Sequence, residues 1–275
     1  MSIPAGYDWA RNVFGFSSLP LSAVFAVLSA LFLVDILYNS LIRVPKRPIY
    51  NWLIGWGVLR LVGFVLRAVC LTGSLGSNST LVITTQVFLS IGYIPLLKVF
   101  IQNVFIIAKV VHPKAPYGPI ERLVNLLTLA FVVCIIVYLN MYFPDLPNPI
   151  TSTEQTLRDA AYWGLTALAA LPTLYIFRVL GDVRFTKVVT TLLIQGALLL
   201  IKIGFSLYKN YQGGLNDEIY FYLLTILPEF LYMAFYLLPG YFADLMADIA
   251  AGGEGGVKVE LGSVESGQGH NYASV

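Results

Sequence analysis

Residues 19–42, LPLSAVFAVLSALFLVDILYNSLI, form an apolar run in which Asp35 is the single charged residue. A helix needs about 20 predominantly apolar residues to cross the roughly 30 Å hydrocarbon layer of a bilayer, because each residue rises about 1.5 Å. Unpaired backbone amides are costly in lipid, so a spanning run is expected to be helical along its length. The preceding segment holds one base, Arg11, and we therefore predict a first transmembrane helix and not a cleavable signal peptide.

Six further runs meet the same test of length and polarity. The predicted spans are Leu19–Ile42, Trp52–Leu71, Leu81–Ala108, Leu123–Phe143, Ala160–Phe177, Val188–Tyr208 and Tyr220–Met246. The composition agrees, because 57% of the residues are hydrophobic and 12% are charged, against roughly 25% charged in soluble domains. The sequence predicts an all-α, multi-pass helix bundle at residues 1–250, in the plasma membrane or an endomembrane. Residues 251–275, rich in Gly and Ser, have the composition of a disordered tail.

Basic residues are distributed unevenly between the two sets of loops. The loops after the first, third and fifth helices and the tail hold Arg43, Lys46, Arg47, Lys109, Lys114, Arg122, Arg178, Arg184, Lys187 and Lys258, whereas the other side holds Arg11, Arg158 and Lys209. By the positive-inside rule, the C-terminus is expected in the cytoplasm and the N-terminus outside. Asn78 begins the sequon Asn78-Ser79-Thr80 on the predicted outer side, so Asn78 is a candidate glycosylation site.

Charged side chains within the spans need a physical explanation, because each costs on the order of 2.5–3.5 kcal/mol at a helix centre. Four are expected within roughly 6–9 Å of an interface, which a long side chain reaches by snorkelling: Asp35, Arg67, Lys98 and Lys202. Arg60 and Glu229 are expected about 13–15 Å from either surface, where opposite charges at equal depth can pair or flank a polar cavity.

The candidate ligand-binding or ion-pair residues are therefore Arg60, Glu229, Lys98 and Lys202. A structural ion pair and a ligand or ion site are both open interpretations of Arg60 and Glu229. Prolines within spans are expected to kink their helices: Pro95, Pro172, Pro228 and Pro239. Pro228 directly precedes Glu229, so a kink there would free a backbone carbonyl beside the carboxylate.

Several chemistries are not indicated by the sequence. The last predicted span has no lysine for a retinal Schiff base, and residues 106–111, IIAKVV, lack the acidic-Arg-aromatic triplet of common G-protein-coupled receptors. No H-E-x-x-H, G-x-S-x-G or P-loop motif is present. The spacing of Cys70, Cys134, His112 and His270 suits neither a disulfide framework nor a metal site. We expect no cofactor, and the net charge of +2 gives no argument for nucleic acid.

Four short motifs carry a resemblance to a known family. They are Trp52 with Arg60 and Gly63, Ile91-Gly92 with Pro95-Leu96-Leu97, Lys202 with Ser206-Leu207-Tyr208, and Pro228-Glu229. Together they resemble a group of fungal seven-helix integral membrane proteins known as a domain of unknown function, in which arginine often stands at the position of Lys202. More distantly, residues 217–222, DEIYFY, resemble the start of the last helix in the fungal lipid-translocating exporter family. The resemblance implies a seven-helix topology and a fungal setting, and no biochemical activity.

Two functional hypotheses follow. The outside N-terminus, short loops and cytoplasmic tail favour a seven-helix receptor or sensor, by analogy of topology. The central charges and helix-breaking prolines favour a transporter of a small molecule or lipid instead. An enzyme is not expected, because no nucleophile, base and orienting group occur together. The expected partners are the lipid bilayer and a small-molecule or lipid ligand.

Overall fold

The computed structural model describes residues 7–12, 14–43, 48–72, 75–112, 114–142, 151–179, 186–212, 218–238 and 249. In these segments seven helical stretches are long and apolar enough to cross a membrane: Leu19–Leu41, Ile49–Cys70, Ser79–Val111, Tyr117–Met141, Ser152–Val179, Lys187–Lys209 and Glu218–Leu237. The predicted all-α bundle with seven spans is confirmed. The protein is a multi-pass integral membrane protein.

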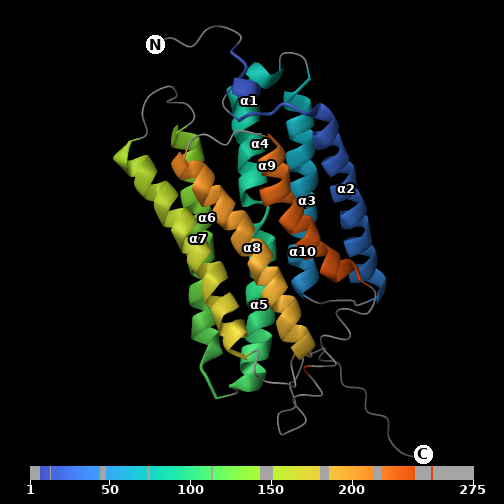
Figure 1. Ribbon diagram of the computed structural model, residues 1–275, viewed down its shortest axis with the longest axis vertical. Coiled ribbons are helices and arrows are strands. Elements are labelled where there is room, and N and C mark those ends of the chain that lie inside the picture. The colour runs from blue at the N-terminus through green and yellow to red at the C-terminus, as the bar shows by residue number, and fades with distance from the viewer. Residues whose placement is uncertain are drawn as a thin grey trace, which may run out of the picture.

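The helices follow one another along the chain with short connections (Figure 1). Their bounds are α1 (Trp9–Asn12), α2 (Leu19–Tyr38), η1 (Asn39–Arg43), α3 (Pro48–Cys70), η2 (Leu75–Ser77), α4 (Ser79–Ile91), α5 (Ile94–Val111), α6 (Tyr117–Tyr142), α7 (Ser152–Val179), α8 (Thr186–Gln212), α9 (Glu218–Phe221), η4 (Tyr222–Ile226) and α10 (Leu227–Leu237). η1 and η4 are π-helical and η2 is a 3₁₀ turn.

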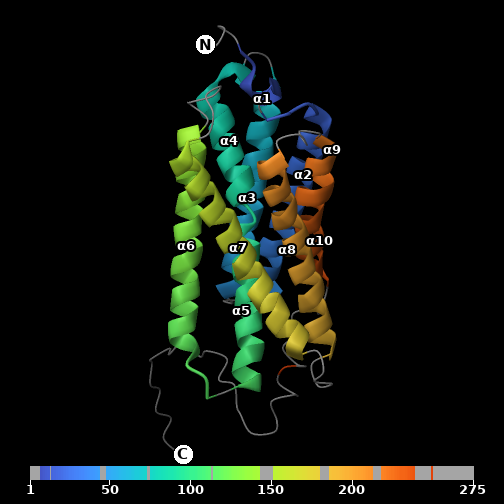
Figure 2. The same cartoon turned by 60° about the vertical axis from the view of Figure 1, so that its left-hand side comes forward.

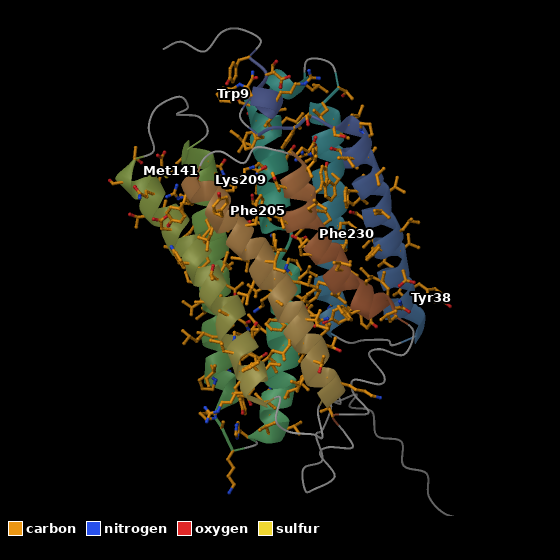
Figure 3. All side chains as sticks on the ribbon, viewed as in Figure 1. Trp9, Tyr38, Met141, Phe205, Lys209 and Phe230 are labelled. Atoms are coloured by element: carbon orange, nitrogen blue, oxygen red, sulfur yellow. The ribbon has the colours of Figure 1, made fainter. Side chains whose placement is uncertain are left out.

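The long helices run side by side along the long axis of the molecule (Figures 1 and 2). Trp9, Met141 and Lys209 lie toward one end, which we call the N-terminal end, and Tyr38 lies toward the opposite end (Figure 3). Because α5 and α10 run away from the N-terminal end, both finish at the opposite end (Figure 1). The helix ends that flank the two sets of loops therefore lie at different ends of the bundle.

Burial separates a central helix from helices that face outward. Most residues of α5 are buried, including Leu96, Val99 and Phe100. In contrast, α2 and α6 expose apolar side chains, with Val34 65% exposed and Leu126 65% exposed. Exposed apolar side chains on a helix of spanning length are suited to contact with lipid tails. The central position of α5 matters for the site, because side chains of several helices meet it.

The third span was predicted as one helix, but the structure divides it at Gly92 and Tyr93 into α4 and α5. Pro95 occupies the first turn of α5, where its missing N–H removes the least backbone hydrogen bonding. The last span has a π-helical turn, η4, directly before Pro228 in the first turn of α10. Pro172, by contrast, lies inside an uninterrupted α7.

The ends of the helices are set by polar caps that hydropathy does not detect. α7 begins at Ser152, before the predicted Ala160, because Thr151 and Glu154 form a reciprocal capping box. The Asn78 side chain accepts a hydrogen bond from the backbone N–H of Leu81 at 3.1 Å and so caps α4. The predicted continuation of the last span to Met246, Pro239 and the tail at residues 251–275 lie outside the described residues.

Candidate functional site

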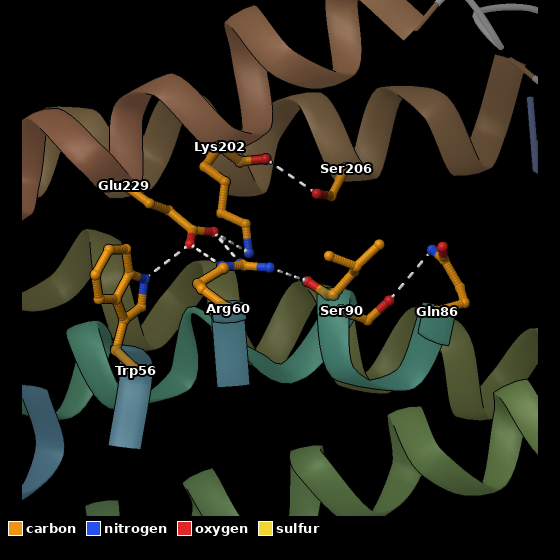
Figure 4. A network of polar contacts seen from close by, with 8 residues as sticks. Trp56, Arg60, Gln86, Ser90, Lys202, Ser206 and Glu229 are labelled. Atoms are coloured by element: carbon orange, nitrogen blue, oxygen red, sulfur yellow. Dashed lines mark hydrogen bonds and ion pairs between the residues drawn. The ribbon is translucent and has the colours of Figure 1, made fainter. Parts of the chain in front are cut away.

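Glu229, in the first turn of α10, accepts three hydrogen bonds from two residues of α3. Arg60 donates through Nε to Oε2 at 2.6 Å and through Nη2 to Oε1 at 2.5 Å. Trp56 donates from its indole Nε1 to Oε2 at 3.1 Å. A two-point guanidinium–carboxylate contact is the strongest form of ion pair in proteins. The structure thus brings together Arg60 and Glu229 as the matching depth of the two residues suggested (Figure 4).

Lys202 of α8 also reaches this carboxylate. Its Nζ lies 3.1 Å from Oε1 of Glu229, and 3.1 Å from the centroid of the Tyr93 ring. The side chain is 3% exposed, so the prediction that Lys202 snorkels to an interface is wrong. Two reasons account for the difference: α8 continues past the predicted end at Tyr208 to Gln212, and α10 packs against α8 and offers a carboxylate.

The turn between α4 and α5 makes room for the Arg60 guanidinium. Arg60 Nη1 donates a hydrogen bond to the carbonyl of Leu89 at 2.8 Å, in the last turn of α4. A Cβ added at Gly92 would lie 2.8 Å from Cζ of Arg60, closer than nonbonded carbon atoms approach. Glycine is therefore the residue that lets the guanidinium lie against this turn.

We call Trp56, Arg60, Tyr93, Lys202 and Glu229 the Glu229 cluster. None of these five side chains has appreciable contact with solvent, and Arg60 and Trp56 are 0% exposed. With its ionisable groups charged, the cluster holds two bases and one carboxylate, and therefore one positive charge more than negative. An excess charge in a buried site is costly unless a neighbouring dipole, ring or anion compensates it. The face of the Tyr93 ring supplies part of that compensation as a cation–π contact.

The cluster lies where two spans are irregular. Tyr93 belongs to the turn that breaks the third span, and Glu229 follows the π-helical turn and Pro228 of the last span. π-Turns and broken helices within membranes occur frequently at functional sites, because irregular backbone is tolerated there only when it is buried in protein or lines a polar space. The irregular backbone and the buried charges are thus two independent indications of a functional site at the Glu229 cluster.

Aromatic rings pack against the cluster and between it and the N-terminal end. Phe230 packs edge-on against Trp56 with ring centroids 5.3 Å apart, and Phe25 stacks on Tyr222 at 4.8 Å. Phe64 lies 5.5 Å from Phe25. These rings, contributed by α2, α3, η4 and α10, form a closely packed apolar layer directly next to the buried charges.

Lys98 is not part of the Glu229 cluster. It is buried in α5, donates a hydrogen bond to Oδ1 of Asn125, and lies 5.8 Å from the centroid of the Trp52 ring. The prediction that Lys98 snorkels is wrong as well. The third span is 33 residues long, and α3 and α6 cover the Lys98 side chain. Among the candidates, the structure unites Arg60, Glu229 and Lys202 and separates Lys98 from them.

Arg67 and Asp35 lie near helix ends, as expected. Arg67 does not reach water, however: its Nη2 pairs with Oε1 of Glu218 at 2.7 Å, and its guanidinium lies 4.1 Å from the centroid of the Phe16 ring. The Ser17 hydroxyl donates to the other oxygen of Glu218. This second buried ion pair closes the N-terminal end of the bundle. Asp35 accepts a hydrogen bond from Asn39 at 2.7 Å within the same helical stretch.

Sequence reasoning missed Trp56 and Tyr93. Trp56 precedes Arg60 by four residues and so lies on the same face of α3, a spacing that could have identified it. No sequence signal identifies Tyr93, because its contact with Lys202 depends on how α8 packs. Among the described residues, no group of three or more His, Cys, Asp or Glu side chains could hold a metal ion. No family model, curated protein or solved structure matches the chain.

Proposed function

We propose that the protein is a seven-helix receptor or sensor in which the Glu229 cluster is the element that responds to a ligand. The observation that carries the proposal is that one carboxylate on α10 is shared by bases on two other helices, Arg60 on α3 and Lys202 on α8. A group that competes for either base would change the contacts between three spans at once. Buried ion pairs suit such a role, because their geometry has discrete alternatives.

The excess positive charge indicates the chemistry of the ligand. Lys202 has three donor hydrogens and shares its carboxylate with an arginine that already engages both oxygens. A carboxylate or phosphate of a small molecule or lipid would supply the missing negative charge and accept these hydrogens. If the ligand makes these contacts more favourably in one arrangement of the bundle than in another, its binding shifts the bundle toward that arrangement.

A transporter is the second candidate, and a specific observation favours it. Secondary transporters place substrates near the middle of the membrane between helices whose α-helical course is interrupted. The α4–α5 turn and the η4 turn put two such interruptions at the Glu229 cluster. In that case the cluster would bind the same anionic class of molecule and release it on the other side.

A two-stage experiment tests the proposal. Purified protein is screened by thermal unfolding against small carboxylates, phosphates and anionic lipids, and any stabilising compound is retested with Lys202→Met and with Lys109→Met. Lys109 is a matched control, because its side chain is 51% exposed and its ammonium pairs with Glu121 on the surface. We expect the stabilisation to disappear in Lys202→Met and to persist in Lys109→Met. Equal stabilisation of both variants would contradict a ligand site at the cluster.

Flux measurements then separate the two candidates. The stabilising compound, radiolabelled, is followed across sealed proteoliposomes containing the wild-type protein or Glu229→Gln. Binding without flux supports the receptor, whereas flux that is lost in Glu229→Gln supports the transporter. Membership in the fungal seven-helix group, suggested by the four motifs that include Arg60 and Pro228-Glu229, is likewise a proposal, and it is compatible with either function.

A further inference from the structure

Buried polar atoms without a hydrogen-bond partner are concentrated on one side of the Glu229 cluster. In the described part of the chain these side-chain atoms are Tyr93 Oη, Gln102 Oε1, Asn103 Oδ1, Tyr175 Oη, both amide atoms of Gln195, and Arg67 Nε. Apart from Arg67, the residues belong to α5, α7, α8 and the turn before α5. An unpaired buried polar group costs about 1–3 kcal/mol, so such a concentration needs an explanation.

Gln195 and Asn103 lie at the same level of the bundle as Tyr236, beyond the cluster toward the opposite end. α8 and α10 run in opposite directions (Figure 1). Gln195 precedes Lys202 by two helical turns, and Tyr236 follows Glu229 by two helical turns, so both lie displaced from the cluster in the same direction. Asn103 of α5 donates a hydrogen bond to the Tyr236 hydroxyl at 2.8 Å. We call Asn103, Gln195 and Tyr236 the polar layer.

Tyr232 links the polar layer to the cluster. Its hydroxyl donates to the carbonyl of Leu96 at 3.2 Å and lies 3.5 Å from the Tyr236 hydroxyl. Tyr232 is one turn from Glu229 on the same face of α10. Polar side chains therefore continue without a break along α10 from the carboxylate to the layer, and all of them are buried.

Tyr175 lies beyond the polar layer, toward the end of the bundle opposite the N-terminal end. Its ring lies 6.4 Å from the ring of His112, which is exposed and follows the last residue of α5. Toward the N-terminal end the situation differs, because the stacked rings of Phe25 and Tyr222 and the Arg67–Glu218 pair fill the bundle. Among the described residues, every one of these unpaired polar atoms except Arg67 Nε thus lies at the cluster or between it and the end where α5 and α10 terminate.

We propose that ordered water occupies the polar layer and connects the Glu229 cluster with the aqueous phase at the end where α5 and α10 terminate. Buried water typically makes about three hydrogen bonds to otherwise unpaired groups. Gln195 alone offers a donor and an acceptor, and Asn103 adds an acceptor. The cluster is then accessible from one side of the membrane to water, protons and small hydrogen-bonding solutes. This inference holds for a receptor and for a transporter.

Cysteine accessibility tests the water path. With the free cysteines Cys70 and Cys134 replaced by alanine, Gln195→Cys is exposed to a small cationic methanethiosulfonate in sealed proteoliposomes, with a thiol scavenger on the other side. Leu53→Cys is the control, because Leu53 is 0% exposed and lies near the start of α3 at the same end. Since only a hydrated thiolate reacts, Gln195→Cys should be modified on the order of tenfold faster or more, and from one side only.

A second measurement uses the wild-type protein and so does not depend on any variant folding. Hydroxyl radicals generated by X-rays label side chains next to ordered water, and the products are identified by mass spectrometry. Tyr236 and Tyr222 are matched tyrosines, at 4% and 5% exposure. We expect Tyr236 to be labelled several times faster. Equal labelling of the two tyrosines, equal modification of Gln195→Cys and Leu53→Cys, or modification from the N-terminal end would each overturn the proposal.

Discussion

Glu229 is the carboxylate that both bases of the cluster share. Its two oxygens accept hydrogen bonds from Arg60 and Trp56 and pair with the ammonium of Lys202. No second acid in the described part of the chain forms an ion pair with Arg60 or Lys202. The three charges are therefore not equivalent. Removing the carboxylate leaves two bases without a counter-charge. Removing Arg60 leaves Lys202 to neutralise the carboxylate, and removing Lys202 leaves an Arg60–Glu229 pair with no net charge.

This asymmetry gives a ranking that thermal unfolding in detergent can measure. Glu229→Gln should destabilise most, because breaking a buried pair costs roughly 3–5 kcal/mol and arginine cannot shed its proton. Arg60→Met should cost less, and Lys202→Met least. The double variant Arg60→Met/Glu229→Gln should be more stable than Glu229→Gln alone, because the remaining lysine can become neutral.

The surface pair Lys109–Glu121, with side chains 51% and 37% exposed, provides the control cycle. Its coupling should stay within about 1 kcal/mol, as for other exposed ion pairs. Additive effects of Arg60→Met and Glu229→Gln, equal to the behaviour of the control, would show that the two buried charges do not depend on each other.

At the level of elements, the break in the third span is what admits the Arg60 guanidinium. α4 and α5 are joined by Gly92 and Tyr93, and the guanidinium lies against Gly92 while Lys202 lies against the Tyr93 ring. The sequence offered Ile91-Gly92 and Pro95 as signals, but a Gly and a Pro within a span are also compatible with a continuous helix, as Pro172 in α7 demonstrates.

A glycine replacement tests the role of this turn. Gly92→Ala should lower the stability by on the order of 1–3 kcal/mol, the usual cost of overpacking a buried site, because the new Cβ would lie 2.8 Å from the guanidinium carbon. Gly204→Ala in α8 is the control, since no heavy atom outside its chain neighbours and its own helix backbone lies within 4 Å of the added Cβ. There alanine should be neutral or stabilising by up to about 1 kcal/mol. Equal unfolding temperatures for the two variants would contradict the close approach.

For the whole molecule, the direction of insertion stays a prediction from the distribution of basic residues. The helix ends that flank the two sets of loops lie at opposite ends of the bundle (Figure 1), and the charge bias assigns the end with the C-termini of α5 and α10 to the cytoplasm. In this predicted orientation, the proposed water path opens toward the cytoplasm, and the Arg67–Glu218 pair faces the outside.

Protease protection and glycosidase treatment measure this orientation. A C-terminal tag on the full chain should resist an external protease in sealed cells, and become sensitive after permeabilisation. Any glycan should be on Asn78, and should disappear with Asn78→Gln. That variant also replaces the cap of α4, so Thr80→Ala, which destroys the sequon and keeps the cap, is the better control. Cleavage of the tag in intact cells would reverse the orientation.

The sequence by itself determined the fold class and the number of spans, because the cost of placing polar residues and unpaired backbone in lipid is a local property of each run. It also placed Arg60 and Glu229 at matching depth, which follows from counting residues along each of the two spans. The sequence did not determine the helix ends, since α7 extends to Ser152 through polar caps that an apolar run does not include.

Only the tertiary structure decided which charges meet. Depth along a helix is the same whichever neighbour faces a residue, so Lys98 and Lys202 could not be distinguished from their sequence positions. Packing gives Lys202 the carboxylate of Glu229 and the ring of Tyr93, and gives Lys98 Asn125 and Trp52 instead. The rotation of each helix about its axis and its choice of neighbours result from packing of the whole bundle, which no single span encodes.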